Sequence, residues 1–203
     1  MKKLLILHIL MLISLHAYSQ TDQFDTGESG FTIYGQISPY EYSTLVGLGA
    51  AYTESGQFTM GITLGLEESN DADLTSTAIK PFLAYRAVRQ GENNAPLNVI
   101  IGASYQHNNF KDLDFTAGTI GLNLIVSHRI TTKSSFVIIP FAGLNYSRTK
   151  LDVDLLWFSN RYSGVGFNIG SSFLINQFYL TPTVLFADGD SNFNLSFGIL
   201  LPN

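Results

Sequence analysis

Apolar and polar residues alternate along most of the chain from Gly30 onward. Successive side chains of a β-strand point to opposite faces of a sheet, so a period of two predicts strands with one apolar and one polar face. We predict ten strands, at 30–38, 42–53, 57–67, 76–88, 97–107, 114–128, 134–147, 160–175, 177–187 and 191–201. The strand at 134–147 fits least well, because Val137, Ile139 and Phe141 interrupt its polar face.

The alternation fits a soluble β-sandwich or barrel as well as a membrane barrel, and the residues of the polar face decide between them. That face meets water in a soluble sheet and usually carries charged side chains, but here it carries mainly Gly, Ser, Thr and Asn. Only 13% of the residues are charged, against about 25% in an ordinary soluble domain. Small neutral side chains suit a narrow lumen, with the apolar face turned towards lipid.

No apolar run after the N-terminal region is long enough for a membrane-spanning helix, since the stretch 136–144 stops at nine residues. Only a closed barrel otherwise satisfies the backbone polar groups inside lipid. We therefore predict an all-β fold, a closed antiparallel up-and-down transmembrane β-barrel of ten strands. Eight strands are the alternative strand number, and a soluble periplasmic barrel is the alternative architecture.

The N-terminal region has the pattern of a secretory signal. Lys2 and Lys3 precede an apolar stretch, 4–15, and Ala17 and Ser19 place small residues before a cleavage point. We predict a signal peptide at 1–19, a short N-terminal segment at 20–29 and an outer-membrane barrel domain at 30–203.

Composition excludes several classes of protein. The chain has no cysteine, so it has neither a disulfide framework nor a thiol for lipid attachment. Loss of Lys2 and Lys3 with the signal changes the net charge from −5 to −7, which disfavours nucleic acid as a partner.

The lengths of the connections suggest an orientation. Outer-membrane barrels have short periplasmic turns and longer external loops. If both chain ends are periplasmic, the tight connection 176–177 lies inside and the longest connection, 148–159, lies outside.

The sequence resembles the small outer-membrane β-barrel proteins common in Bacteroidota, with an architecture like that of the OmpX and OmpW types. The resemblance rests on the signal ending Ala17-Tyr18-Ser19-Gln20, on glycine-alternating strands such as Val46-Gly47-Leu48-Gly49, and on the closing stretch Phe193–Phe197. It implies contact with outer-membrane lipid, lipopolysaccharide and the outer-membrane assembly machinery. It identifies no functional residues.

Charged residues on the polar face form the first candidate site. By parity Glu67, Lys80 and Arg86 point into the lumen. They form either a gate or selectivity element, or a structural ion-pair cluster that holds the strand register. We favour the structural interpretation, because buried ions are retained mainly when they are paired.

An apolar cluster in the longest predicted loop forms the second candidate site. Leu155, Leu156, Trp157 and Phe158 are either an outer-loop patch that binds a partner or an anchor at the membrane interface. Both interpretations remain open.

Two further motifs suggest chemistry only weakly. The stretch Asp188–Asn192 has alternating oxygen ligands but lacks the later glutamate of a calcium loop, so we interpret it as a polar turn and predict no metal and no cofactor. His107 lies near Asp112 and Asp114, but no nucleophile motif accompanies them, and we predict that the protein is not an enzyme.

The sequence thus predicts an integral outer-membrane protein, exported by its signal peptide, with a structural or surface-interaction role and a monomeric state. A narrow channel for small solutes is the alternative function, and an enzyme at the outer rim is the third.

Overall fold

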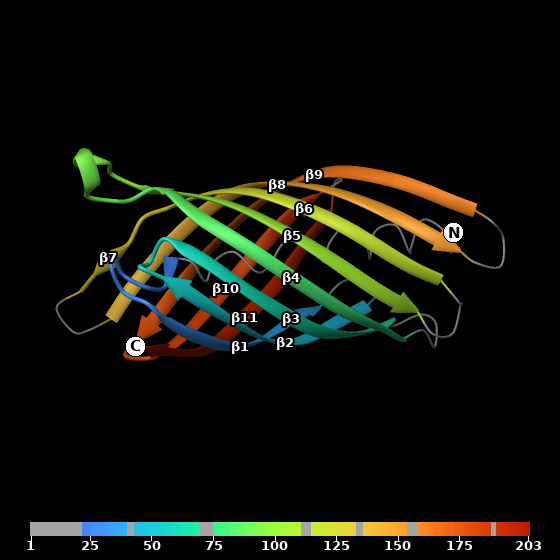
Figure 1. Cartoon of the computed structure of the whole chain (residues 1–203), viewed down its shortest axis with the longest axis horizontal. Helices are drawn as coiled ribbons and strands as arrows, with labels where there is room; N and C mark the ends of the chain where they lie inside the picture. The colour runs from blue at the N-terminus through green and yellow to red at the C-terminus, as the bar shows by residue number, and fades with distance from the viewer. Residues whose placement is uncertain are drawn as a thin grey trace.

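The computed structural model describes residues 22–39, 43–69, 75–110, 115–132, 136–153, 158–187 and 190–203. Ten long antiparallel strands form the wall of a barrel, and strands that follow one another in the chain lie side by side (Figure 1). The strands are β1 (Gly30–Pro39), β2 (Ser43–Glu54), β3 (Phe58–Ser69), β4 (Thr75–Val88), β5 (Asn98–Phe110), β6 (Phe115–Ser127), β8 (Phe136–Val153), β9 (Phe158–Ile175), β10 (Phe178–Ala187) and β11 (Asp190–Pro202).

Two pairings close the barrel. The first strand pairs with the last, with Gly30 opposite Pro202. Strand β6 pairs with β8 over its whole length, and the two-residue strand β7 (Ile130–Thr131) adds a short pairing to β8. Every long strand therefore has two neighbours, and the predicted fold class, a closed antiparallel barrel of ten strands, is confirmed.

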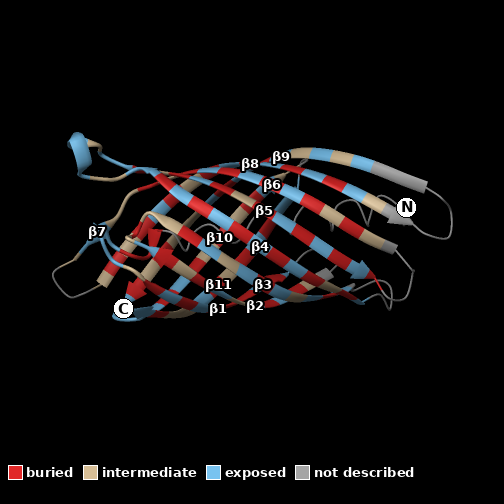
Figure 2. Cartoon of the chain, viewed as in Figure 1, coloured by how far each residue is buried: buried red, intermediate tan, exposed pale blue. Residues whose placement is uncertain are grey.

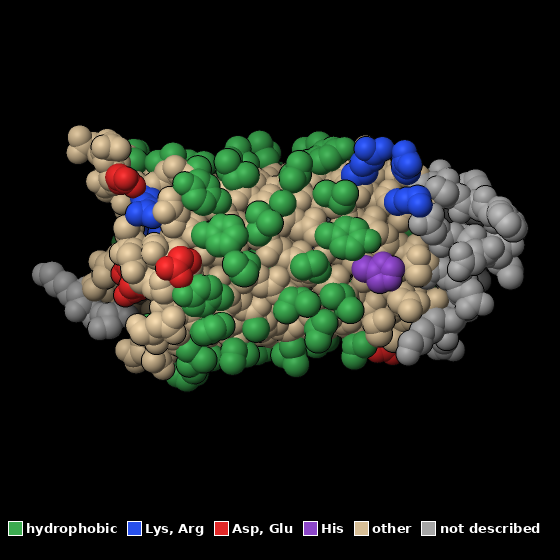
Figure 3. Space-filling view, viewed as in Figure 1, with side chains coloured by type: hydrophobic (Ala, Val, Ile, Leu, Met, Phe, Trp, Pro, Cys, Tyr) green, Lys and Arg blue, Asp and Glu red, His purple; other side chains and the backbone are tan. Residues whose placement is uncertain are grey.

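The outer wall of the barrel is mainly apolar, whereas its lumen holds many polar side chains. Along the strands buried and exposed residues alternate (Figure 2), and most of the exposed ones are apolar, with Leu48 and Val165 among the most open at 69% and 66%. The lumen side carries buried polar residues such as Thr63 and Asn145. On the face that Figure 3 shows, apolar side chains cover the middle of the outer wall. A belt of this kind suits hydrocarbon, which confirms the membrane barrel over the soluble one.

Among the residues that the structure describes, no helix has both the length and the apolar character needed to cross a membrane.

The two ends of the barrel differ. One end, called the turn end here, carries the start of β1, the end of β11 and the connections between β2 and β3, β4 and β5, β6 and β8, and β9 and β10. The β2–β3 turn is tight, with three residues, 55–57, between the strands and positive φ at Ser55 and Gly56. The β4–β5 connection holds a single 3-10 turn, η3 (Glu92–Asn94). The opposite end is called the loop end.

The β8–β9 hairpin is longer than the sequence indicated. Both strands have 18 residues, and β9 extends beyond β10 at the loop end (Figure 1), because the last residue of β10, Ala187, pairs with Gly166. The predicted loop 148–159 is wrong over most of its length, because Arg148 and Lys150 continue the outward face of β8 while Thr149 stays buried. Charged residues beyond the apolar belt resembled a loop in the sequence, and the remaining connection lengths do not orient the barrel.

The lumen is apolar near the turn end. Val137, Ile139 and Phe141, which made the seventh predicted strand ambiguous, are buried on the lumen side of β8. They belong to one buried cluster with residues of the other strands and of the N-terminal segment, including Phe24, Tyr34, Phe82, Ile100, Ile125, Leu174 and Tyr179. These inward-facing apolar side chains therefore share a buried cluster with Phe24, from the chain that precedes β1.

Candidate functional site

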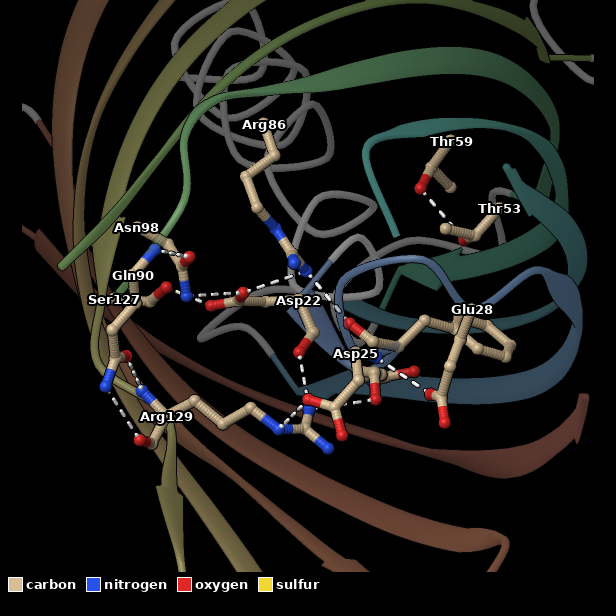
Figure 4. A network of polar contacts seen from close by, with 12 residues as sticks. Asp22, Asp25, Glu28, Thr53, Thr59, Arg86, Gln90, Asn98, Ser127 and Arg129 are labelled. Carbon is tan, nitrogen blue, oxygen red and sulfur yellow. Dashed lines mark hydrogen bonds and ion pairs between the residues drawn. The ribbon is translucent and has the colours of Figure 1, made fainter. Parts of the chain in front are cut away.

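The N-terminal segment, residues 22–29, lies within the mouth of the barrel at the turn end (Figure 4). Asp22, Gln23 and Phe24 are almost fully buried, at 3%, 1% and 1% exposure, whereas Asp25 is open. The segment therefore inserts its first described residues into the lumen and then returns to the rim, where β1 begins.

The carboxylate of Asp22 is held by three strands. Its Oδ1 atom lies 3.1 Å from Nη2 of Arg86 on β4, and both side chains are at most 4% exposed. The same oxygen accepts a hydrogen bond of 2.9 Å from Nδ2 of Asn98 on β5. The Oγ atom of Ser127, at the end of β6, donates to Oδ2. A buried carboxylate is costly unless it is paired in this way, so Asp22 fastens the segment to the wall.

Two arginines hold the backbone of the segment as well. Nη1 of Arg129 donates to the carbonyl oxygens of Asp22 and Gln23, at 3.1 and 3.0 Å. Arg86 donates from Nη2 to the carbonyl oxygen of Phe24, at 3.1 Å. Nε of Arg129 lies 2.7 Å from Oδ1 of Asp25, as an ion pair rather than a directed hydrogen bond. Ion pairs and hydrogen bonds to backbone carbonyl oxygens thus hold the same four residues, 22–25.

Backbone hydrogen bonds complete the attachment to the rim. Gly27 donates to the carbonyl oxygen of Ser55 at 3.0 Å, and Ser55 donates to Oγ of Ser29 at 2.9 Å. At Gly56 a Cβ atom would lie 2.0 Å from the carbonyl oxygen of Asp25, so the turn approaches the segment as closely as only glycine allows. The β2–β3 turn and the segment therefore fit together as one unit.

The three predicted lumen charges, Glu67, Lys80 and Arg86, are all buried, at 3 to 4% exposure, but they lie at different heights. Glu67 is opposite Ser76, and Lys80 is opposite Thr63. Arg86 lies six residues further along β4, about 20 Å at the usual rise of a strand. The structure separates Arg86 from the other two and brings it to Asp22.

Strand parity did not reveal Asp22 or Arg129, because both lie outside the predicted strands. The available signal was charge: the segment before β1 carries Asp22, Asp25 and Glu28, which complement cations of the barrel. The second predicted site lies outside the described residues at Leu155, Leu156 and Trp157, and Phe158 is described only as the first residue of β9.

His107 does not point towards the lumen. It lies on the outward face of β5 near the loop end, where its side chain is exposed. Asp112 and Asp114, its suggested partners, are outside the described residues.

A closed, lipid-compatible, ten-stranded wall with a polar lumen defines this protein as an outer-membrane β-barrel. The family model described as autotransporter beta-domain matches residues 16–153. The chain belongs to the autotransporter β-domain family.

Two solved structures show the same fold. The β-domain of the Bordetella autotransporter BrkA is similar with a TM-score of 0.56 and 11% sequence identity, over 86% of this chain and 99% of that one. The translocator domain of the autotransporter NalP from Neisseria meningitidis is similar with a TM-score of 0.54 and 12% identity, over 98% and 97%. No curated protein matches the sequence significantly.

Proposed function

We propose that this protein is a sealed outer-membrane barrel with a structural or surface-interaction role. The observation that carries the proposal is the attachment of Asp22, which is bound by β4, β5 and the end of β6 inside the mouth of the barrel. A segment fixed in this way blocks the turn end for solutes. The barrel then serves as a membrane anchor that presents its loop end to the surroundings.

The proposed orientation has the turn end in the periplasm and the loop end outside the cell. The proposed orientation keeps the expectation that both chain ends are periplasmic, because the start of β1 and the end of β11 lie at the turn end. Strand β9 of the β8–β9 hairpin extends beyond β10 at the loop end and supplies a projecting surface for interaction.

The seal has both an apolar and a polar part. Phe24 belongs to the buried cluster and packs close to Gly30, where a Cβ atom would lie 2.8 Å from Cε1 of Phe24. The Asp22–Arg86 pair and the Arg129 contacts surround that apolar plug. Withdrawing the segment would leave Arg86 buried without its carboxylate partner, a change that costs about 3–5 kcal/mol in typical buried pairs.

Conductance in planar lipid bilayers tests the proposal. The wild-type barrel should give no stable conductance, whereas a variant that lacks residues 22–25 should open a measurable pore. Glu54→Gln, a change at an exposed residue of the same rim, is the matched control and should stay closed. A heat-induced shift in gel mobility checks that each variant is folded. Stable conductance of the wild-type barrel would contradict the sealed state.

A second candidate function is a narrow channel for small solutes. It is favoured by the amides of Asn123 and Asn145, which face each other across β6 and β8 and are buried in the lumen. Among the described residues neither amide has a hydrogen-bond partner. Buried polar groups of this kind are commonly served by water, so a hydrated path is a reasonable hypothesis.

The same recordings distinguish the channel from the seal. A channel requires conductance in the wild-type protein and a lower conductance when Asn123 and Asn145 are both changed to Leu. In a sealed barrel, the double change alters conductance only in the variant that lacks residues 22–25.

We further propose the finer assignments that the sequence suggested. Residues 1–19 act as the export signal, the assembly machinery inserts the chain as a monomer, and outer-membrane lipid and lipopolysaccharide surround it. The chain is of the OmpX and OmpW type found in Bacteroidota and has no enzymatic activity. Support for these assignments comes from the sequence pattern.

A further inference from the structure

A basic groove lies on the outer wall of the barrel near the loop end. It has a volume of about 520 Å³, and its lining includes His107 and Tyr105 of β5, Ile120 of β6, Arg148 and Lys150 of β8, and Arg161 of β9. Figure 3 shows Lys and Arg side chains gathered at this end, with a histidine beside them and the apolar belt next to them. None of the described residues that line the groove carries a carboxylate.

The strand register forces cations of the groove together. Lys150 is directly opposite Arg161 on the neighbouring strand, and both side chains are exposed on the same outward face. Arg148 shares that face two residues earlier on β8. Like charges that face each other across an antiparallel pair destabilise the sheet. Three cations gathered on one face of the outer wall give the groove a positive field that attracts anionic ligands.

The groove lies at the level where lipid headgroups begin. Two residues before Arg148 on the outward face of β8 is Tyr146, and Leu144 follows below it, at 41% and 54% exposure. On β5 Tyr105 lies next to His107 in the same manner, with 47% exposure. Tyrosines mark the boundary between hydrocarbon and headgroups, so the cations reach the polar layer of the leaflet.

We propose that the basic groove binds the phosphate groups of a phosphorylated glycolipid in the outer leaflet. An arginine guanidinium group can donate two parallel hydrogen bonds to phosphate oxygens, and Lys150 adds a point charge. Lys150 and Arg161 are about 5 Å apart at their Cα atoms, as in any directly opposed pair. Arg148 is about 7 Å further along the strand. This spread suits a headgroup with more than one phosphate better than a phospholipid with a single one.

The choice of leaflet rests on the proposed orientation, in which the loop end faces outwards. The binding chemistry itself is independent of whether the lumen is sealed. A conducting barrel would therefore contradict the proposed function without affecting the groove.

Lipid binding to the purified full-length barrel tests the groove. Native mass spectrometry from detergent would measure competition between diphosphorylated lipid A and the same lipid with its phosphates removed. We expect at least a tenfold preference for the phosphorylated form and a loss of that preference in the double variant K150Q/R161Q. The exchange variant K150R/R161K keeps the charges and should retain the preference.

The matched control is Arg89→Gln, which removes a cation at the turn end, outside the groove. It should leave lipid A binding unchanged. A heat-induced gel shift verifies that K150Q/R161Q is a folded barrel.

Four outcomes would overturn the proposal. Equal binding of phosphorylated and dephosphorylated lipid A would remove the role of phosphate. Equal binding of phosphatidylglycerol would remove the preference for a glycolipid. Displacement of lipid A by inorganic phosphate at the same concentration would assign the groove to a free anion. Cleavage of the β8–β9 hairpin from the periplasmic side, and not by protease added to intact cells, would exclude the outer leaflet.

Discussion

Oδ1 of Asp22 lies 3.1 Å from Nη2 of Arg86, although the two residues are far apart in the chain and both side chains are shielded from solvent. One belongs to the segment before the first strand and the other to β4. Their pairing turns a barrel wall and a short N-terminal extension into one structure. The pair also gives the buried guanidinium group of Arg86 a carboxylate partner inside the lumen.

Replacement of Asp22 by Asn should therefore destabilise the barrel strongly. The change keeps the shape of the side chain but leaves Arg86 without its carboxylate. Loss of one partner of a buried pair costs about 3–5 kcal/mol in the free energy of unfolding. Urea unfolding of the protein in lipid vesicles measures the difference.

Asp25→Asn is the matched control, because the Asp25 side chain is 56% exposed in its ion pair with Arg129. An exposed pair contributes only about 0–1 kcal/mol. If Asp22→Asn and Asp25→Asn had the same small effect, the buried pair would not hold the segment.

Replacement of Phe24 by Ala should release the segment from the lumen. Phe24 is 1% exposed and lies in the buried cluster with Ile100 and Ile139. A buried Phe→Ala change costs about 3–5 kcal/mol, so the contacts of Asp22 alone would have to hold the segment in the lumen. Cleavage after Glu28 by a glutamate-specific protease should become much faster than in the wild-type protein.

Phe178→Ala removes an aromatic ring from the outer wall, where Phe178 is 65% exposed, and serves as the control. Cleavage after Glu28 should stay at the wild-type rate in this variant. Equal protection in Phe24→Ala and the wild-type protein would mean that the ring does not anchor the segment.

The strands could be predicted from the sequence because alternation is a local signal. Strand β3 spans Phe58–Ser69, close to the predicted 57–67, and its side chains from Phe58 to Glu67 face the predicted way. Parity assigns a face but not a partner. It placed Arg86 on the lumen side without indicating that Asp22, from a segment with no periodicity, would reach it.

Two other features could not be predicted from the local alternation of apolar and polar residues. The extension of β8 to Val153 carries Arg148 and Lys150 on its outward face, and charge on that face had been interpreted as a loop. The apolar residues Ile139 and Phe141 on the lumen side contradicted the expected polar lumen. Both are explained by tertiary context: strands can continue past the membrane, and a lumen can hold an apolar plug.

Replacement of Gly56 by Ala tests the fit between the β2–β3 turn and the segment. Gly56 has a φ of +57°, and an added Cβ atom would lie 2.0 Å from the carbonyl oxygen of Asp25. The left-handed conformation alone costs an alanine about 1–2 kcal/mol. The contact with Asp25 adds to this cost, so the free energy of unfolding should fall by more than that amount.

Gly91→Ala isolates the conformational part of the cost. Gly91 has a φ of +85°, and an added Cβ atom there would meet no atom within 4 Å. Urea unfolding of both variants should show the larger loss for Gly56→Ala. Equal losses would mean that the segment does not press against the turn.

Replacement of Leu64 by Arg tests whether the outer face of β3 is in contact with hydrocarbon. Leu64 lies near the middle of its strand and is 56% exposed. An arginine on the lipid face at the bilayer midplane costs about 2–4 kcal/mol, and close to 0–1 near the interface. The same change at Leu201, which is 38% exposed near the end of β11, is the control and should cost much less. Both variants would be unfolded by urea in lipid vesicles. A membrane barrel requires the large difference between the two positions, whereas a barrel surrounded by water would tolerate arginine equally at both.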